Sequence, residues 1–190
     1  MNLIDPTQLD LPEQLTTARL RLRIVKPDDG QRLHTAVHAS QRHLQQWMPW
    51  AVNPMNEESY EMYANQQYNK FLRREEFQFL LYLPHSDAVI GSIGFHHIRW
   101  QVPKLEIGYW LHKDFGGQGY MTEAVERMSV WAFEALGMVR LAIECDALNE
   151  KSAAVARRCG YTQEGHLRHN RRDVLTNDLS DTLVFSRLAP

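Results

Sequence analysis

One short segment of this 190-residue chain has the residue types and spacing of an anion-binding loop. It places three glycines between a strand-like stretch and a helix-like one, in the run Phe115-Gly116-Gly117-Gln118-Gly119-Tyr120-Met121-Thr122. Glycine adopts positive φ and lets a ligand approach the backbone closely. The first N–H groups of a helix have no intrahelical acceptor and lie at the positive end of its dipole. The segment therefore predicts a phosphate loop, with an ordinary glycine-rich connection as the alternative.

Three familiar glycine motifs do not fit this run. No Gly-Lys-Ser/Thr follows it, so it is not the P-loop of nucleoside triphosphatases. A dinucleotide fingerprint starting at Gly117 would need its third glycine where Thr122 stands. Asp114-Phe115-Gly116 imitates a protein kinase triplet, but the companion kinase motifs are missing from the sequence. The run is therefore interpreted as a phosphate loop of another kind.

Several segments, in order, resemble the GNAT superfamily of acetyltransferases. The glycine run is similar to that family's pyrophosphate loop, Q/R-x-x-G-x-G/A, although Gly116 stands at the Gln/Arg position and Met121 at the final Gly/Ala position. Residues 105–111 resemble the strand that splays open to admit pantetheine, and residues 149–161 resemble the N-x-x-S/A-x-x-V-A-x-x-x-G-F/Y helix. Residues 17–23 and 161–165 are typical of the ribosomal-protein-alanine N-acetyltransferase (RimJ/RimL) branch. The resemblance runs from about residue 16 to residue 188.

The resemblance implies acetyl-CoA as co-substrate and no metal. Backbone N–H groups of residues 117–122 would hold the pyrophosphate, and residues 109–111 would pair with pantetheine in the manner of an added strand. An N–H near Trp110 or Leu111 would face the thioester oxygen as charge develops on it. The implied cofactor-binding residues are Tyr109, Trp110, Leu111, Gly116, Gly117, Gln118, Gly119, Tyr120, Met121, Thr122 and Asn149, the last of which would also cap its helix.

Acetyl transfer to an amine also needs a proton acceptor for the amine and a proton for the leaving thiolate. Glu106 is one candidate base, because members of the superfamily often place a base on the splayed strand. Glu164 is the other, because the RimJ/RimL branch has a glutamate in its equivalent of residues 163–165. Many members protonate the thiolate with a tyrosine where this chain has Ala156, so Ser152, one helical turn earlier on the same face, is the expected substitute. The structural alternatives are a solvated or salt-bridged strand carboxylate for each glutamate and an early-turn helix residue for Ser152.

Other chemically suggestive residues have weaker interpretations. His96 and His97 are adjacent in a predicted strand, so they are expected to point to opposite faces and not to bind one zinc ion together. An aromatic loop from Trp47 to Trp50 would either wall a substrate cleft or cover the core. A basic loop before the last strand would overlook the acceptor entrance of the fold that the chain resembles, and it would suit an acidic or phosphorylated acceptor; its residues are Arg168, Arg171 and Arg172.

Hydrophobic periodicity predicts the elements that position these residues. Strands are expected over residues 19–24, 77–83, 89–95, 105–111, 141–145, 161–167 and 179–188. Helices are expected after the turn at 27–29 and over residues 57–74, 121–136 and 151–159. This order predicts an α/β (α+β) fold, in which helices flank a mixed and largely antiparallel sheet. With no linker or repeat, residues 1–190 are expected to form a single domain with its core at about 16–188.

Composition limits the classes of protein that remain. The chain has 21 Lys and Arg against 23 Asp and Glu, a net charge of −2, whereas nucleic-acid binders usually carry a strong basic excess. The two cysteines, Cys145 and Cys159, have no motif spacing and are expected to be buried thiols. Neither a signal peptide nor a membrane-spanning segment is recognisable, so a cytoplasmic enzyme that binds neither nucleic acid nor membranes directly is expected.

The sequence thus predicts an acetyl-CoA-dependent N-acetyltransferase, acting as a monomer or homodimer on the α-amino group of a protein N-terminus. An open cleft would suit that acceptor, and a closed aromatic pocket around Trp47 and Trp50 would suit the alternative, a small amine such as an antibiotic, a polyamine or an amino acid conjugate. A non-catalytic acyl-CoA-binding module is the second alternative. Asn149, Ser152 and the two candidate bases favour the enzyme.

Overall fold

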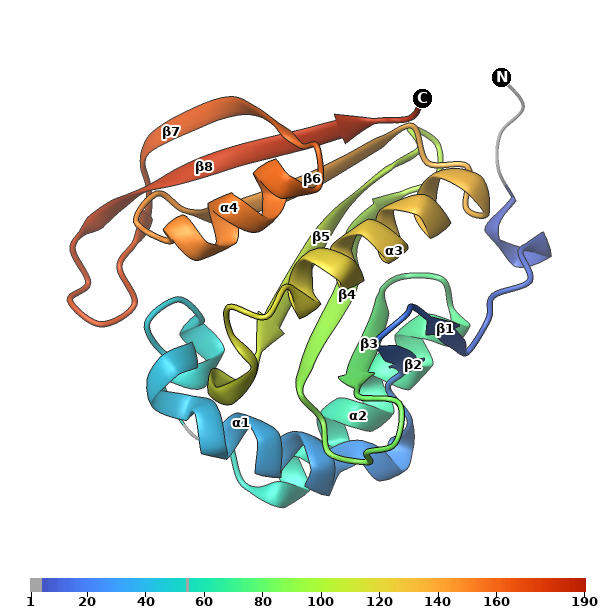
Figure 1. Cartoon of the computed structure of the whole chain (residues 1–190), viewed down its shortest axis with the longest axis horizontal. Helices are drawn as coiled ribbons and strands as arrows, with labels where there is room; N and C mark the ends of the chain where they lie inside the picture. The colour runs from blue at the N-terminus through green and yellow to red at the C-terminus, as the bar shows by residue number, and fades with distance from the viewer. Residues whose placement is uncertain (1–4, 54) are drawn as a thin grey trace.

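Among the described residues, the predicted strands and one short unpredicted strand form one mixed sheet of eight strands, with the order β1-β2-β3-β4-β5-β6-β8-β7 (Figure 1). The computed structural model describes residues 5–53 and 55–190. The strands are β1 (Gln14–Thr16), β2 (Arg21–Ile24), β3 (Phe77–Tyr82), β4 (Gly91–Arg99), β5 (Lys104–Leu111), β6 (Arg140–Asp146), β7 (Thr162–Arg172) and β8 (Leu179–Leu188). The helices are α1 (Gly30–Leu44), α2 (Glu57–Leu72), α3 (Tyr120–Glu134) and α4 (Glu150–Arg158), with short 3-10 turns at Pro6–Gln8, Pro27–Asp29, Pro49–Ala51 and Lys113–Phe115. The fold class and nearly every element agree with the sequence prediction.

The central feature of the sheet is an opening between β5 and β6. These two strands run parallel, whereas the other neighbouring pairs run antiparallel. Among the described residues their ladder holds three pairs and ends at Glu106↔Ala142. Beyond that point β5 continues to Leu111 beside β4 and β6 continues to Asp146 beside β8, so the strands diverge, as Figure 1 shows. The predicted splayed strands are therefore confirmed.

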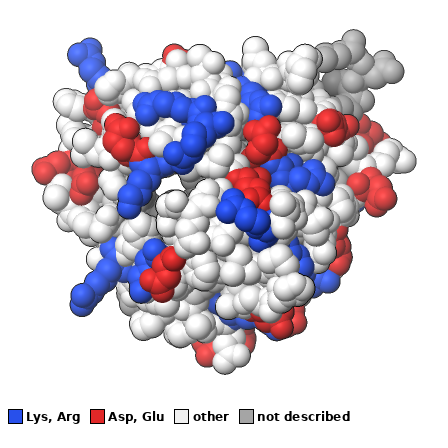
Figure 2. Space-filling view, in the orientation of Figure 1, with Lys and Arg blue, Asp and Glu red and all other residues white. Residues whose placement is uncertain are grey.

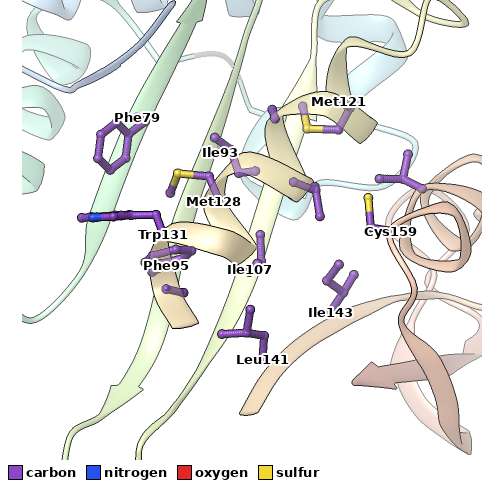
Figure 3. Packing of buried hydrophobic residues seen from close by; sticks show 14 of the residues in the cluster. Phe79, Ile93, Phe95, Ile107, Met121, Met128, Trp131, Leu141, Ile143 and Cys159 are labelled. Carbon is purple, nitrogen blue, oxygen red and sulfur yellow. The ribbon is translucent and has the colours of Figure 1, made fainter. Parts of the chain in front are cut away.

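Helices α3 and α4 cover one face of the sheet (Figure 1). The apolar stripe of α3 includes Met128 and Trp131, which pack with Phe95, Ile107 and other buried strand residues in the main core (Figure 3). The stripe recurs at the three- and four-residue spacing that places side chains on one side of a helix. Leu105 and Ile107 of β5 belong to this core, so the residues between and beyond them, Glu106, Gly108 and Trp110, face the other side.

Helices α1 and α2 cover part of that other face. Their apolar cluster includes Leu33, Tyr60, Leu80 and Trp110, together with other residues from α1, α2, β3 and the segments near them. Within the described chain, this cluster includes no residue of β6, β7 or β8. Glu144, on the outward-facing side of β6, is exposed. The half of the sheet beyond the opening therefore presents a face that these two helices do not cover.

Two details differ from the sequence expectation. The three-residue strand β1, which pairs with β2, was not predicted, because it is too short to show a period. Arg168, Arg171 and Arg172 were predicted in a loop before the last strand, but they lie in β7, which extends to Arg172 and carries irregularities at residues 163–165 and 167–171. Strand β7 is mostly exposed, so its sequence lacks the apolar alternation that marks a strand.

Among the described residues no helix combines the length and the apolar character needed to cross a bilayer.

Candidate functional site

The glycine loop forms the entry to α3. Gly117 and Gly119 have φ of +78° and +81°, and Gly119 is the N-cap residue of α3. Because glycine has no side chain with which to cap the helix, the first N–H groups of α3 keep their bonding capacity for another acceptor. A Cβ added at Gly117 would meet nothing within 4 Å, so the outer side of the loop is open. Unpaired donors beside open space are what a pyrophosphate group requires.

Two arginines from outside the loop hold it in place. Arg19, which precedes β2, donates from Nη1 to the Gln118 carbonyl at 3.0 Å and forms an ion pair with Glu123 at 2.6 Å. Arg158, in the last turn of α4, donates from Nε to the Thr122 hydroxyl at 3.3 Å. Both guanidinium groups therefore lie next to the start of α3, and the charge of Arg19 is paired with that of Glu123. Neither arginine was predicted as a site residue, although Arg19 lies in the segment that resembles the RimJ/RimL branch.

The first turn of α3 is also tied to the segment before β2 through Glu123. The Glu123 carboxylate accepts hydrogen bonds from the Thr17 hydroxyl at 2.5 Å and from the Arg19 backbone N–H at 2.9 Å. Burial raises the pKa of Glu123, but these bonds outweigh it and hold the pKa below its usual value. A negative side chain in the first helical turn is also favoured by the helix dipole. The loop is thus positioned by residues about 100 positions away along the chain.

Tyr109 and Ser152 meet where β5 and β6 diverge. The Tyr109 hydroxyl lies 3.0 Å from Ser152 Oγ and donates to the Ser152 carbonyl at 3.2 Å. Asn149 caps α4, because its Oδ1 accepts the Ser152 N–H at 3.1 Å. Burial raises the pKa of Tyr109 well above its usual value, so its hydroxyl keeps its proton. Ala156, the position at which many superfamily members have a tyrosine, is fully buried. Tyr109 of β5 instead places a phenol against Ser152, one turn earlier in α4. The sequence prediction missed this second hydroxyl.

Glu106 lies at the point where the opening begins, on the face away from α3. Its Oε2 is 2.9 Å from Nδ1 of His97, and His96 stands directly opposite it in the β4–β5 register. The prediction that the two histidines point to opposite faces is wrong, because β4 is irregular between His96 and Arg99 and His97 takes a φ of +50°. That left-handed conformation turns His97 toward the same carboxylate. Glu144 of β6 is near enough for Glu106 to raise its pKa, after the larger effect of burial.

Glu164, the other candidate base, lies away from the opening. Its carboxylate pairs with the guanidinium of Arg140, accepting from Nη1 at 2.9 Å and also from Nη2, and it accepts from Ser186 Oγ at 2.6 Å. The bonds from Arg140 and Ser186 lower the pKa of Glu164 to about 2. Arg140 pairs with Lys104 at the closed end of the β5–β6 ladder. The structure therefore separates Glu164 from Tyr109 and Ser152 and favours its salt-bridged alternative over the predicted role as base.

The aromatic loop after α1 borders the opening. Trp50 contacts Trp110 of β5 edge-on, with ring centroids 6.4 Å apart. Arg171 reaches from β7 to this loop and donates to the Trp47 carbonyl at 3.5 Å, while its Nε lies 3.5 Å from the buried carboxylate of Asp146. The pocket beside Trp50 has a volume of only about 10 Å³. A wider, open hollow of about 720 Å³ lies on β7 and β8 and is lined by His166, Leu167, Arg168, His169, Asn170 and Asp181.

Charges on the visible face are mixed. Figure 2 shows basic side chains gathered over the part of the molecule where Figure 1 draws α4 and β7, with acidic side chains beside them.

In the described part of the chain, no three His, Cys, Asp or Glu side chains are arranged to hold a metal ion. Both cysteines are buried free thiols, and burial raises the pKa of Cys159 to about 11.

Comparison with known proteins agrees with this geometry. Residues 19–162 match the family described as "Acetyltransferase (GNAT) domain". The chain is 32% identical to the putative ribosomal N-acetyltransferase YdaF of Bacillus subtilis (strain 168) over 173 residues, which cover 89% of this chain and 90% of that protein. It is 26% identical to the ribosomal-protein-serine acetyltransferase of Escherichia coli (strain K12), with 89% and 92% of the two chains covered.

Solved structures show the same relationship. The fold matches that of RimL, a ribosomal L7/L12 alpha-N-protein acetyltransferase in complex with coenzyme A, with a TM-score of 0.87 at 25% identity over 93% of this chain and 98% of that one. The microcin C7 self-immunity acetyltransferase MccE, in complex with acetyl-CoA and AMP, matches in fold with a TM-score of 0.85 at 22% identity, covering 94% and 97% of the two chains. The opening, the glycine loop and these matches lead to one conclusion: the chain belongs to the GNAT family of acetyltransferases and is an acetyl-CoA-dependent N-acetyltransferase.

Proposed function

We propose that this enzyme acetylates the α-amino group of a protein N-terminus. The observation that carries the proposal is the open acceptor side: the face of the sheet that bears Glu106 and Glu144 is not covered by α1 and α2 beyond the opening. A peptide end needs such an accessible face, since the rest of its protein must remain outside. The ribosomal-protein acetyltransferases among the relatives support the same class of acceptor.

The residues around the opening fit acetyl-CoA. The N–H groups at the start of α3 would hold the pyrophosphate, with Arg19 and Arg158 close to them. The free edge of β5 beyond Glu106 would accept the pantetheine arm as an added strand, because β6 has turned away from it. The proposed contacts are the predicted ones: Tyr109, Trp110, Leu111, Gly116, Gly117, Gln118, Gly119, Tyr120, Met121, Thr122 and Asn149.

Acetyl-CoA supplies the thioester carbonyl that an amine attacks and the thiolate that then leaves. Glu106 is the carboxylate on the acceptor face at the start of the opening, and we assign to it the binding of the ammonium form of the acceptor, next to the group that takes up its proton. The hydroxyl oxygens of Tyr109 on β5 and Ser152 on α4 lie 3.0 Å apart, and either hydroxyl would donate its proton to the thiolate. A backbone N–H of Trp110 or Leu111 would stabilise the developing oxyanion.

A small-molecule acceptor finds less support. Such an acceptor was expected to sit in a closed aromatic pocket around Trp47 and Trp50. The pocket found at Trp50 is lined mainly by α1 and the segment after it and not by Trp47, and its volume of about 10 Å³ leaves room for about one water molecule. The aromatic loop instead packs Trp50 against Trp110. Trp50 and Trp110 are therefore better placed to line the side of the thioester site than to enclose a drug-sized amine.

The proposal is tested by following free-thiol release from acetyl-CoA in the presence of two sets of acceptors. One set consists of peptides with free N-termini of different first residues, and the other of polyamines, aminoglycosides and amino acid conjugates. We expect the peptides to be acetylated with the higher kcat/KM. Faster turnover of any small amine than of all the peptides would contradict the proposed acceptor, although not the acetyltransferase activity.

A further inference from the structure

The imidazole of His96 occupies the acceptor face next to the opening. His96 lies on β4 directly opposite Glu106, and its ring covers Gly108, the next outward-facing residue along β5. A Cβ added at Gly108 would lie 3.1 Å from both Cδ2 and Nε2 of His96. The ring therefore fills the space that a side chain at position 108 would take. Its Nε2 therefore lies over Gly108, the outward-facing residue between Glu106 and Trp110, and the thioester is expected beside Trp110.

The other side of the ring faces a second carboxylate. Nδ1 of His96 lies 3.7 Å from Oε2 of Glu76, which is held in turn by Nζ of Lys70 at 3.0 Å. A carboxylate beside Nδ1 favours the tautomer with its proton on that nitrogen, which leaves the lone pair of Nε2 available. The side chain of His96 is 33% exposed, so a ligand on this face can reach it.

The surroundings also favour the neutral imidazole. Burial lowers the pKa of His96, and the neighbouring charge on His97 acts in the same direction. Glu76 and Glu106 oppose this effect, but the pKa remains below the ordinary histidine value. His96 and His97 lie on β4, Glu76 directly precedes β3, and Glu106 lies on β5. Lys70 of α2 acts on the ring through its ion pair with Glu76. At neutral pH the ring is therefore ready to accept a proton.

We propose that His96 is a further catalytic residue of this acetyltransferase, which takes the proton of the acceptor amine on Nε2. The inference rests on the proposed reaction at this site. The N–H bond of the acceptor breaks, its electron pair stays on nitrogen for attack on the carbonyl, and the proton forms a new bond to Nε2. Glu106 attracts the ammonium form to the face and, with Glu76, stabilises the imidazolium that results. The proton then passes to solvent before the next turnover.

The test compares the pH dependence of kcat/KM in the full-length enzyme and in His96→Gln, using acetyl-CoA and the best acceptor of the wild-type enzyme. We expect wild-type kcat/KM to fall as the pH drops through a midpoint below the ordinary histidine pKa, since protonated His96 cannot act as a base. His96→Gln is expected to lose that limb and to fall about 100-fold or more, which is the usual range for general acid–base catalysis. His85→Gln, a substitution in the exposed turn after β3, is the matched control and is expected to keep both the rate and the limb.

A second variant separates catalysis from folding. Glu76→Gln removes a group that raises the pKa of His96, so the midpoint of the acid limb is expected to move to lower pH. Calorimetric titration with CoA is expected to give the wild-type affinity for both variants, which shows that the fold is intact. A His96→Gln enzyme with the wild-type rate and the same acid limb would overturn the role of His96 and leave the proposed function standing. Absence of turnover by the wild-type enzyme with every acceptor would overturn both.

Discussion

The hydroxyl oxygens of Tyr109 and Ser152 lie 3.0 Å apart and join β5 to α4 across the opening of the sheet. Ser152 lies one helical turn before the buried Ala156, the position at which many members of the superfamily have a tyrosine. Two hydroxyls from separate elements are thus available where a single phenol would otherwise act. Because they bond to each other, removal of either one changes the hydrogen bonding of the other.

Substitutions at this pair are expected to affect turnover more than binding. Ser152→Ala should lower kcat about tenfold, below the usual range for general acid catalysis, because a thiolate is a good leaving group and Tyr109 can still donate. Tyr109→Phe should have a similar effect and lower the free energy of unfolding by about 1 kcal/mol, the value of one hydrogen bond. The double variant should lose more activity than the product of the two single losses. Steady-state kinetics with acetyl-CoA as the varied substrate measures these changes, and a wild-type kcat in the double variant would refute the assignment.

The glycine loop offers a comparison between two glycines in the same conformation. Gly117 and Gly160 both have positive φ, at +78° and +74°, and a Cβ at either would meet nothing within 4 Å. Alanine at either position should therefore cost about 1 kcal/mol of stability through backbone strain alone. Only Gly117→Ala places a methyl group in the proposed pyrophosphate site, so only this variant should bind CoA more weakly. Calorimetric titration and urea unfolding of the two variants provide the measurements, and equal CoA affinities would show that the loop does not hold the cofactor.

The ion pair of Glu164 with Arg140 is expected to be structural. Glu164→Gln should leave kcat/KM unchanged and destabilise the fold by at most about 1 kcal/mol, because the carboxylate is partly exposed. Since the folded state lowers the pKa of Glu164 to about 2, its stabilisation is present above the ordinary glutamate pKa, about 4.3, and is lost as the pH falls toward 2. The free energies of unfolding of the wild-type protein and of Glu164→Gln, measured with urea, should therefore differ at pH 7 and converge as the pH falls toward 2. A large loss of kcat/KM would restore Glu164 as a catalytic candidate.

The fold and the loop could be predicted from sequence because they depend on local patterns. The apolar stripe of α3 and the glycines before it need only neighbouring residues to be recognised. Strand β1 was not predicted because three residues are too few to show a hydrophobic period. Strand β7 was predicted too short because its mostly exposed residues do not alternate between apolar and polar.

The details of the site depend on contacts between residues distant in sequence. The ion pair between Arg140 and Glu164, which are 24 positions apart, lowers the pKa of a candidate base. No local sequence pattern in either segment predicts this contact. His97 was misplaced because strand alternation assumes negative φ throughout, whereas the irregularity in β4 gives it a φ of +50°. The contact between Tyr109 and Ser152 likewise arises only once β5 and α4 are placed together.

The proposed acceptor is the α-amino group of a protein N-terminus, and one matched pair of peptides tests it directly. The first peptide has a free α-amino group and no lysine; the second has the same sequence with a blocked N-terminus and one added lysine. After incubation with acetyl-CoA, fragmentation mass spectrometry locates any added acetyl group. We predict acetylation of the first peptide at its N-terminal nitrogen and none of the second. Acetylation of the lysine in the second peptide, with the first unmodified, would contradict the proposed function.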